Sequence, residues 1–351
     1  MQLPVRIVRE LGRELVILVD GSGSAQGLEL SHWPGHRTPR PLRHDLSTGC
    51  ALQFARLAQA ERERLAAGAV AIVNNHYDTD GTCALFAVRH PARALELEVQ
   101  LLDAARAGDF FQWPNDRSLC VDAIVHGLAD PALSPLADVR SARSDLERHQ
   151  AATEFLLREL PALLTGDLEP YRALWTSALE AAQNDRRDLA QAARDDLVHL
   201  EWTLWTAEHG ARSTRDGARA HFDPGRHAQF GASQADRVLV IGPGPSGATY
   251  RLVLSTLSWF DLASQTTLPR PDLTALCARL NELEGTQGDA PLAWRAEAVD
   301  SPSPELWFGR ASEARFAEHA PWLEPSRLEP ALVRRAVAEA LRAALLAGLE
   351  R

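Results

Sequence analysis

Residues 70–88 read VAIVNNHYDTDGTCALFAV, and this stretch decides how the first part of the chain folds. Residues 70–73 form a short β-branched apolar run, which is typical of a buried strand. The polar segment 74–81 ends in glycine, and the apolar run 82–88 predicts the first turns of a helix. Strand, polar turn and helix make half of an α/β unit, and ligands commonly bind at the carboxyl ends of such strands.

The polar segment carries three potential ligands, His76, Asp78 and Asp80, each separated from the next by one residue. Residues two apart face the same side of an extended chain, so one imidazole and two carboxylates should converge. Gly81 should allow a sharp exit into the helix. This donor set suits Mn, Zn, Fe or Mg. The alternative is a structural turn in which Asp80 caps the following helix.

The apolar strand followed by H-x-D-x-D-G at 76–81 resembles motif I of the DHH-type phosphoesterases. The resemblance implies hydrolysis of phosphodiesters or pyrophosphate with two divalent metals, usually manganese. It also implies that His76, Asp78 and Asp80 are catalytic and bind metal. The Asp-His-His triplet that defines the superfamily does not occur in the chain, and neither does its GGGH signature.

A second aspartate bridges the metals in DHH-type enzymes, and it lies on a later strand. The resemblance therefore points to Asp109 as a further metal ligand, ahead of Asp103 and Asp122. Asp109 follows an expected helix over 92–107 that Gly108 should end. The alternative for Asp109 is a turn residue after that helix.

Taken as a whole, the chain resembles an uncharacterised bacterial protein family, and no activity follows from that resemblance. The resembling segments are SHWPGHRTP at 31–39, NNHYDTDG at 74–81, LLDAARAGDF at 101–110 and LSTLSWFDL at 254–262.

The stretch from residue 31 to residue 41 is rich in proline and glycine, which excludes regular structure there. Long loops in compact domains are usually functional or disordered, and Trp33 favours an ordered loop. One interpretation is a substrate-binding loop in which His32, His36 and Arg37 lie near His76. The other is a surface loop with solvated histidines.

Composition narrows the classes of function. The formal net charge is -10 and the pI is about 5.7, so stable binding to duplex nucleic acid is not expected. A small anionic substrate stays possible, because bound metals can supply the positive charge. The four cysteines form no CxxC pair, and no signal peptide or run of eighteen apolar residues is present. These features predict a cytoplasmic protein with no membrane partner and leave the oligomeric state open.

The sequence predicts an α/β fold with three regions: a parallel-sheet lobe over 1–130, a long helical region over 131–212, and a mixed α+β lobe over 230–351. In the first lobe a strand at 15–19 ends in a turn at Asp20, and a helix is expected over 51–67. The helical region should continue from 169 to 208. In the last lobe we expect a hairpin around GPGPSG, a β-like run at 258–267, helices at 271–284 and 330–349, and strands at 294–299 and 306–309.

These observations predict a metal-dependent phosphoesterase-like hydrolase of a small phosphorylated or nucleotide substrate, with manganese as the cofactor. Two alternatives remain open. One is a non-catalytic binding protein for small anions or nucleotides on a phosphoesterase-like scaffold. The other is a structural interaction protein built on tryptophan-bearing helices.

Overall fold

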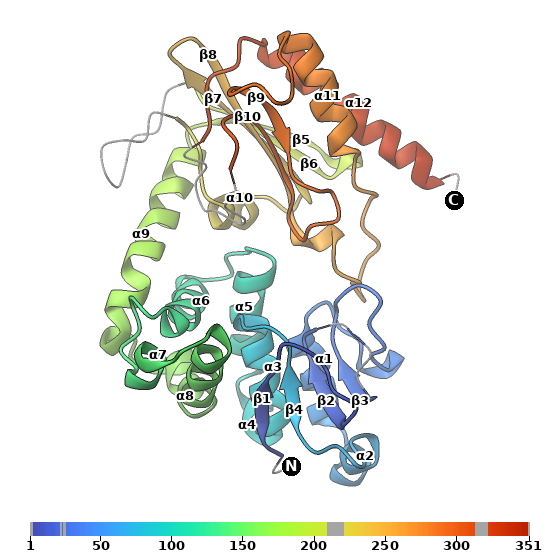
Figure 1. Ribbon diagram of the computed structural model, residues 1–351, viewed down its shortest axis with the longest axis vertical. Helices are drawn as coiled ribbons and strands as arrows, with labels where there is room; N and C mark the ends of the chain where they lie inside the picture. The colour runs from blue at the N-terminus through green and yellow to red at the C-terminus, as the bar shows by residue number, and fades with distance from the viewer. Residues whose placement is uncertain (1–2, 22, 24–25, 209–220, 313–321, 350–351) are drawn as a thin grey trace. The chain divides into compact units, whose positions relative to one another are not determined.

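A four-stranded parallel sheet organises the first unit of the computed structural model (Figure 1), which describes residues 3–21, 23, 26–208, 221–312 and 322–349. This unit comprises Met1–Glu180 and Phe260–Thr266. The strand order is β1-β4-β2-β3, and every pair of neighbours is parallel. The strands are β1 (Val5–Ile7), β4 (Ile72–Asn74), β2 (Leu15–Val19) and β3 (Gln26–Leu30). The carboxyl ends of all four strands therefore meet at one edge of the sheet.

Helices cover one face of this sheet and form with it the largest apolar core among the described residues, whereas Val8 and Leu11 pack on the other face. They are α1 (Ser47–Arg56), α2 (Gln59–Leu65), α3 (Thr79–Arg89), α4 (Pro91–Glu96), α5 (Glu98–Asp109), α6 (Asp116–Ala129), α7 (Ala137–Ser141) and α8 (Asp145–Thr165), with the 3-10 turns η1 (Arg40–Leu42) and η2 (Glu169–Tyr171). Helix α3 is buried from Thr79 to Val88 because β4, α1 and α5 pack around it. The turn that precedes α3 is thereby held firmly in place.

A six-stranded mixed sheet organises the second unit, Ala181–Trp259 and Thr267–Arg351, in the order β5-β6-β7-β8-β10-β9. Its strands are β5 (Ala193–Leu197), β6 (Trp202–Thr206), β7 (Arg237–Gly244), β8 (Gly247–Leu254), β9 (Ala293–Ala296) and β10 (Glu305–Gly309). Only the β6–β7 pair is parallel among these described strands. The helices are α10 (Arg226–Ala232), α11 (Leu273–Glu284) and α12 (Pro330–Leu349), with the 3-10 turns η3 (Val198–Leu200) and η4 (Thr256–Ser258).

The predicted fold class is confirmed: a parallel sheet at the amino end, helices in the middle and a mixed sheet in the last part. The predicted hairpin is β7–β8, and the predicted closing helix is α12. The three regions 1–130, 131–212 and 230–351 stay a prediction, and the two compact units divide at 180/181, 259/260 and 266/267. Helices α7 and α8 pack into the first unit because Leu156, Leu160 and Leu163 join its core.

Several local predictions are wrong. The helix expected to run to 208 ends with α9 (Arg172–Leu189), and β5 and β6 follow it. Trp202 and Trp205 lie on β6, because the segment WTLWT has the aromatic and β-branched composition of a strand. The expected helix over 51–67 is interrupted at Leu57. Residues 258–267 form no strand, and Gly108 lies inside α5 rather than ending it.

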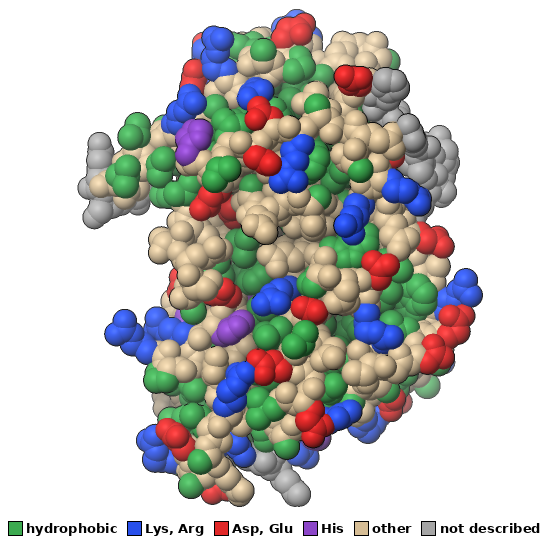
Figure 2. Space-filling view, turned by 180° about the vertical axis from the view of Figure 1, so that it is seen from behind, with side chains coloured by type: hydrophobic (Ala, Val, Ile, Leu, Met, Phe, Trp, Pro, Cys, Tyr) green, Lys and Arg blue, Asp and Glu red, His purple; other side chains and the backbone are tan. Residues whose placement is uncertain are grey.

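None of the described helices is long and apolar enough to cross a lipid bilayer. On the face drawn in Figure 2, acidic and basic side chains are interspersed rather than gathered by sign. That surface offers no broad basic track for a nucleic acid backbone among its described residues.

Candidate metal centre

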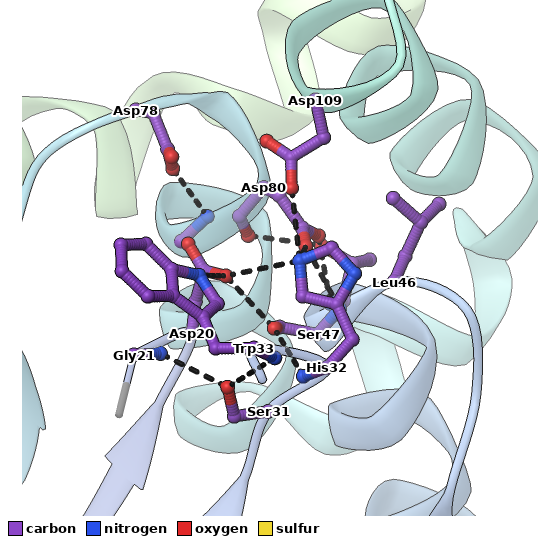
Figure 3. Close-up of polar contacts among 12 residues, drawn as sticks. Asp20, Gly21, Ser31, His32, Trp33, Leu46, Ser47, Asp78, Asp80 and Asp109 are labelled. Atoms are coloured by element: carbon purple, nitrogen blue, oxygen red, sulfur yellow. Dashed lines mark hydrogen bonds and ion pairs between the residues drawn. The ribbon is translucent and has the colours of Figure 1, made fainter. Parts of the chain in front are cut away.

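Three neighbouring strands deliver polar residues to the same edge of the parallel sheet (Figure 3). Asp20 directly follows β2, and His32 lies two residues after β3. The segment from His76 to Asp80 follows β4 and enters α3. Asp109, the last residue of α5, reaches the same place from a helix. Because the strand order is not the order in the sequence, residues from distant segments meet here.

The ligand atoms of these residues form two groups that share Asp20. The fully buried group consists of Asp20, His32, Asp80 and Asp109. The partly exposed group consists of Asp20, His76 and Asp78. Within each group the ligand atoms lie within 4.8 Å of one another, which suits donors placed around one cation at bond lengths of about 2 Å.

Asp20 has a strained backbone conformation, with φ at 49° in the left-handed region. Such conformations in residues other than glycine concentrate at functional sites. Its Oδ1 accepts hydrogen bonds from Trp33 Nε1 at 3.1 Å and from Ser47 Oγ at 2.8 Å. Its Oδ2 is buried and lies 3.0 Å from His76 Nε2, but it accepts no hydrogen bond from the described residues.

The orientation of His32 is set by its second ring nitrogen. Nδ1–H donates to the backbone carbonyl of Asp45 at 2.5 Å, which leaves Nε2 as the ligand nitrogen. Nε2 lies 3.0 Å from Asp109 Oδ2, 3.5 Å from Asp20 Oδ1 and 3.6 Å from Asp80 Oδ2. Although three carboxylates surround it, it makes no hydrogen bond within the described part of the chain. Nε2 of His32, with these three carboxylates around it, is a candidate ligand for a cation.

Asp80 is fixed by the amino terminus of α1. Its Oδ2 accepts from the backbone N–H of Ser47, and its Oδ1 from that of Thr48, both at 2.8 Å. The N-cap residue of α1, Leu46, offers no side-chain acceptor, so Asp80 satisfies these two donors from a neighbouring helix. The alternative role considered for Asp80, capping α3, is wrong.

Asp78 caps α3 and also faces the second ligand group. Its Oδ1 accepts from the backbone N–H of Gly81 at 2.8 Å, while its Oδ2 lies 2.7 Å from His76 Nε2. The side chains of His76 and Asp78 are 25% and 24% exposed, respectively. This group therefore borders solvent, whereas the group around His32 does not.

Gly81 is required by crowding, not by the sharp exit expected from the sequence, since it lies inside the first turn of α3. A Cβ at this position would lie 2.0 Å from Asn74 Nδ2, 2.9 Å from Asp20 Oδ2 and 3.0 Å from Asp78 Oδ1. Any larger residue would push the two aspartates apart.

Burial and mutual repulsion keep two of the carboxyl groups from ionising easily. Burial, together with the negative charge of Asp20, raises the pKa of Asp80 to about 6. Burial, followed by the charges of Asp80 and Asp78, raises the pKa of Asp109 well above its ordinary value. The carboxylates are thus crowded enough to resist carrying their full negative charge unaided.

The same cluster makes the two imidazoles easier to charge, because neighbouring carboxylates raise their pKa values. Burial lowers the pKa of His32, but Asp109 and Asp20 outweigh it and raise that pKa well above its ordinary value. Burial also lowers the pKa of His76, and the charges of Asp78 and Asp20 outweigh it in the same way. The pKa of Asp20 is lowered because these imidazoles offset the effect of its own burial. The cluster therefore favours positive charge at its centre.

The charge balance of the cluster fits a pair of divalent cations. Four carboxylates face two imidazoles in the two ligand groups. Two divalent ions would neutralise four carboxylates and bind both ring nitrogens in their neutral form. Asp20 Oδ2 and His32 Nε2 are buried and make no hydrogen bond within the described residues, although they lie 3.0 Å from His76 Nε2 and Asp109 Oδ2, respectively.

The structure brings together His76, Asp78, Asp80 and Asp109, all expected from the sequence as metal ligands. His32, expected to contact substrate, belongs to the buried ligand group.

The other two residues expected to bind substrate lie outside both ligand groups. His36 Nδ1 accepts from the backbone N–H of Thr38 at 3.2 Å. Arg37 is 59% exposed, and its Nε pairs with Glu29 at 3.3 Å. The reserve candidates Asp103 and Asp122 are not part of either group.

Sequence reasoning missed Asp20, which was interpreted only as a turn residue. Its position was the available signal, because it directly follows the apolar strand at 15–19 in a predicted parallel sheet. Residue 22 of the same turn lies outside the described residues.

A family model matches residues 4–349. The chain belongs to DUF6687, described as a family of unknown function. No curated protein matches the chain. The DUF6687 description carries no activity.

Proposed function

We propose that this DUF6687 protein is a metal-dependent, phosphoesterase-like hydrolase of a small phosphorylated or nucleotide substrate. The observation that carries the proposal is the pair of ligand groups joined by Asp20 at the carboxyl edge of a parallel sheet. Paired cations that share a carboxylate are a recurrent device for hydrolysing phosphate esters. The resemblance of H-x-D-x-D-G at 76–81 to motif I of the DHH-type phosphoesterases supports the same reaction class.

Each ligand group would hold one cation, and manganese suits a set of carboxylates and imidazoles. When bound, the two ions would lower the pKa of a water molecule and offset charge on the phosphoryl oxygens. Contacts within the protein hold two of the metal ligands in place before a cation binds. The amino terminus of α1 fixes Asp80, and the carbonyl of Asp45 fixes His32.

The substrate would approach the partly exposed group, because His76 and Asp78 are the ligands that reach solvent. The chain has a net charge of -10, so the cations themselves would attract an anionic substrate. Arg37 follows His32 in the same loop and stays a predicted contact for the substrate anion.

We place this reaction in the cytoplasm. All four cysteines are free thiols, and Cys50, Cys83 and Cys120 are buried. Free thiols persist most readily in a reducing compartment.

The test is manganese binding by the chelator-treated protein, followed by a hydrolysis screen with phosphodiesters, pyrophosphate and phosphomonoesters. We expect two equivalents of manganese and metal-dependent hydrolysis, both lost in the double variant Asp78→Asn/Asp80→Asn. Glu29→Gln is the matched control for manganese binding, because Glu29 is also buried on a neighbouring strand but lies outside both ligand groups. It is not the control for hydrolysis, because Glu29 pairs with Arg37. Absence of manganese binding in the wild type would overturn the proposal, and binding without hydrolysis of any substrate would indicate a binding protein.

A further inference from the structure

A short segment from the later part of the chain belongs to the first unit. This segment, Phe260–Thr266, is called the strap here, and both of its ends continue into the second unit. The backbone N–H of Asp261 donates to the carbonyl of His32 at 2.9 Å. In return, Asp261 Oδ2 accepts from the backbone N–H of Gly35 at 2.8 Å. The strap is therefore bonded to the loop that carries a metal-centre histidine.

Asp45 connects the strap to the ring of that histidine. Its Oδ1 accepts from the backbone N–H groups of Ala263 and Ser264 at 2.7 and 2.8 Å, and its Oδ2 accepts from the Ser264 hydroxyl. The backbone carbonyl of Asp45 accepts from His32 Nδ1–H. Asp45 thus binds the strap through its side chain and orients the His32 imidazole through its backbone carbonyl.

Phe260 makes the closest ring contact with His32. The two rings are stacked, with centroids 3.7 Å apart and planes inclined by 17°. Phe110, next to Asp109, closes the arrangement, with its centroid 6.0 Å from that of Phe260 and 6.1 Å from that of His32. Stacking on one face prevents the imidazole from tilting, and His32 is fully buried as a result.

We propose that Phe260 is a positioning residue that holds the His32 ring so that Nε2 stays directed at the carboxylates of the buried ligand group. The consequence for metal binding and catalysis rests on the proposed function. A segment of the first unit that is distant in the sequence thereby contributes a ring contact to His32. No part of the H-x-D-x-D-G motif provides this contact.

Variants of Phe260 that keep or remove the aromatic ring distinguish a positioning role from a role in filling space. Phe260→Leu keeps an apolar side chain but removes the stacked ring, whereas Phe260→Tyr keeps the ring. Gln265→Ala is the control on the same strap, because Gln265 is exposed. A space-filling role predicts that the leucine variant behaves like the wild type. A positioning role predicts that only the tyrosine variant does.

The first measurement is nitrogen-detected NMR of the histidine rings in the metal-free protein. The Nδ1–H signal of His32 is assigned by its disappearance in His32→Gln. We expect this proton to be protected from solvent exchange in the wild type, in Phe260→Tyr and in Gln265→Ala, and to exchange rapidly in Phe260→Leu. Equal protection in all four proteins would overturn the inference, and this readout does not depend on metal.

The second measurement is a manganese titration of the same variants. We expect Phe260→Leu to weaken one of two binding events by about 10- to 100-fold, with the other unchanged and full recovery in Phe260→Tyr. If manganese binds but Phe260→Leu matches the wild type, Phe260 has no role at the metal centre. If the wild type binds no manganese, the proposed function fails, while the NMR result still decides whether Phe260 positions His32.

Discussion

Each unit of the molecule buries a cluster of charged side chains, and the two clusters differ in their ratio of acidic to basic groups. In the second unit, Arg251 donates to Asp223 at 2.9 Å and to both oxygens of Glu305, and Arg226 also donates to Glu305. Two guanidinium groups there face two carboxylates. In the first unit, four carboxylates face two imidazoles. The cluster in the second unit is therefore balanced in charge among these residues, whereas the one in the first unit has an excess of carboxylates over imidazoles.

The two clusters also differ in how they respond to protons. The carboxylates of Asp223 and Glu305 offset the burial of Arg251 and raise its pKa further, so this guanidinium stays charged. The pKa of Asp80, by contrast, is raised to about 6, within the range in which proteins function. The two clusters therefore differ in their response to pH, because Asp80 titrates near neutral pH and the Arg251 guanidinium does not.

The largest effect is expected when the balanced cluster is broken. Arg251→Met would leave Asp223 and Glu305 buried without their main partner and should lower the free energy of unfolding by about 3–5 kcal/mol. Denaturant unfolding measures this loss, and manganese binding by the folded protein should be unchanged. The control is Arg194→Met, which removes an exposed ion pair with Asp196. A loss no larger than that of the control would contradict the structural role of the cluster.

Removing the carboxylate shared by the two ligand groups is the next test. Asp20→Asn keeps an oxygen that can accept from Trp33 and Ser47 but removes a ligand charge from both groups. We expect affinity for both manganese ions to fall by at least about 100-fold, as measured by calorimetric titration. Glu29→Gln should bind as the wild type does. Two ions bound by Asp20→Asn with wild-type affinity would show that the groups do not share this ligand.

Metal binding should stabilise the first unit selectively. Manganese at 100 times its dissociation constant should raise the free energy of unfolding by about 2.7 kcal/mol. Hydrogen exchange should locate the added protection at the carboxyl ends of β2 and β4, and the β7–β8 hairpin should not change. An equal increase in Asp20→Asn would mean that the metal binds elsewhere.

The smallest effect concerns the pH dependence of the metal-free protein. Neighbouring carboxylates outweigh burial and raise the pKa values of His32 and His76 above 6.5. Their stabilising contribution is complete below the unfolded-state pKa and is lost as the pH rises through the higher folded-state values. Stability in chelator should therefore decline above about pH 6.5, by on the order of 1–2 kcal/mol. Thermal unfolding across this range measures the decline, and a rise instead would contradict the direction of these shifts.

Much of the local structure could be predicted from short stretches of sequence. The run 70–73 predicted a buried strand, and β4 spans Ile72–Asn74 with α3 directly behind it. The predicted hairpin and closing helix are likewise local, since turn residues and apolar periodicity act over a few positions. Prediction failed at β5 and β6, where alanine and leucine nearby favoured helix and pairing with neighbouring strands favoured sheet.

The H-x-D-x-D-G residues could be identified from the sequence alone, because residues two apart in one polar segment stay close in almost any fold. Only the tertiary structure decided that Asp20, His32 and Asp109 join them. Their meeting depends on the strand order β1-β4-β2-β3, which neighbouring residues do not specify. The stacking of Phe260 on His32 depends on a segment more than two hundred positions away. The raised pKa of Asp80 depends on burial by all of these elements, and burial exists only once the chain has packed.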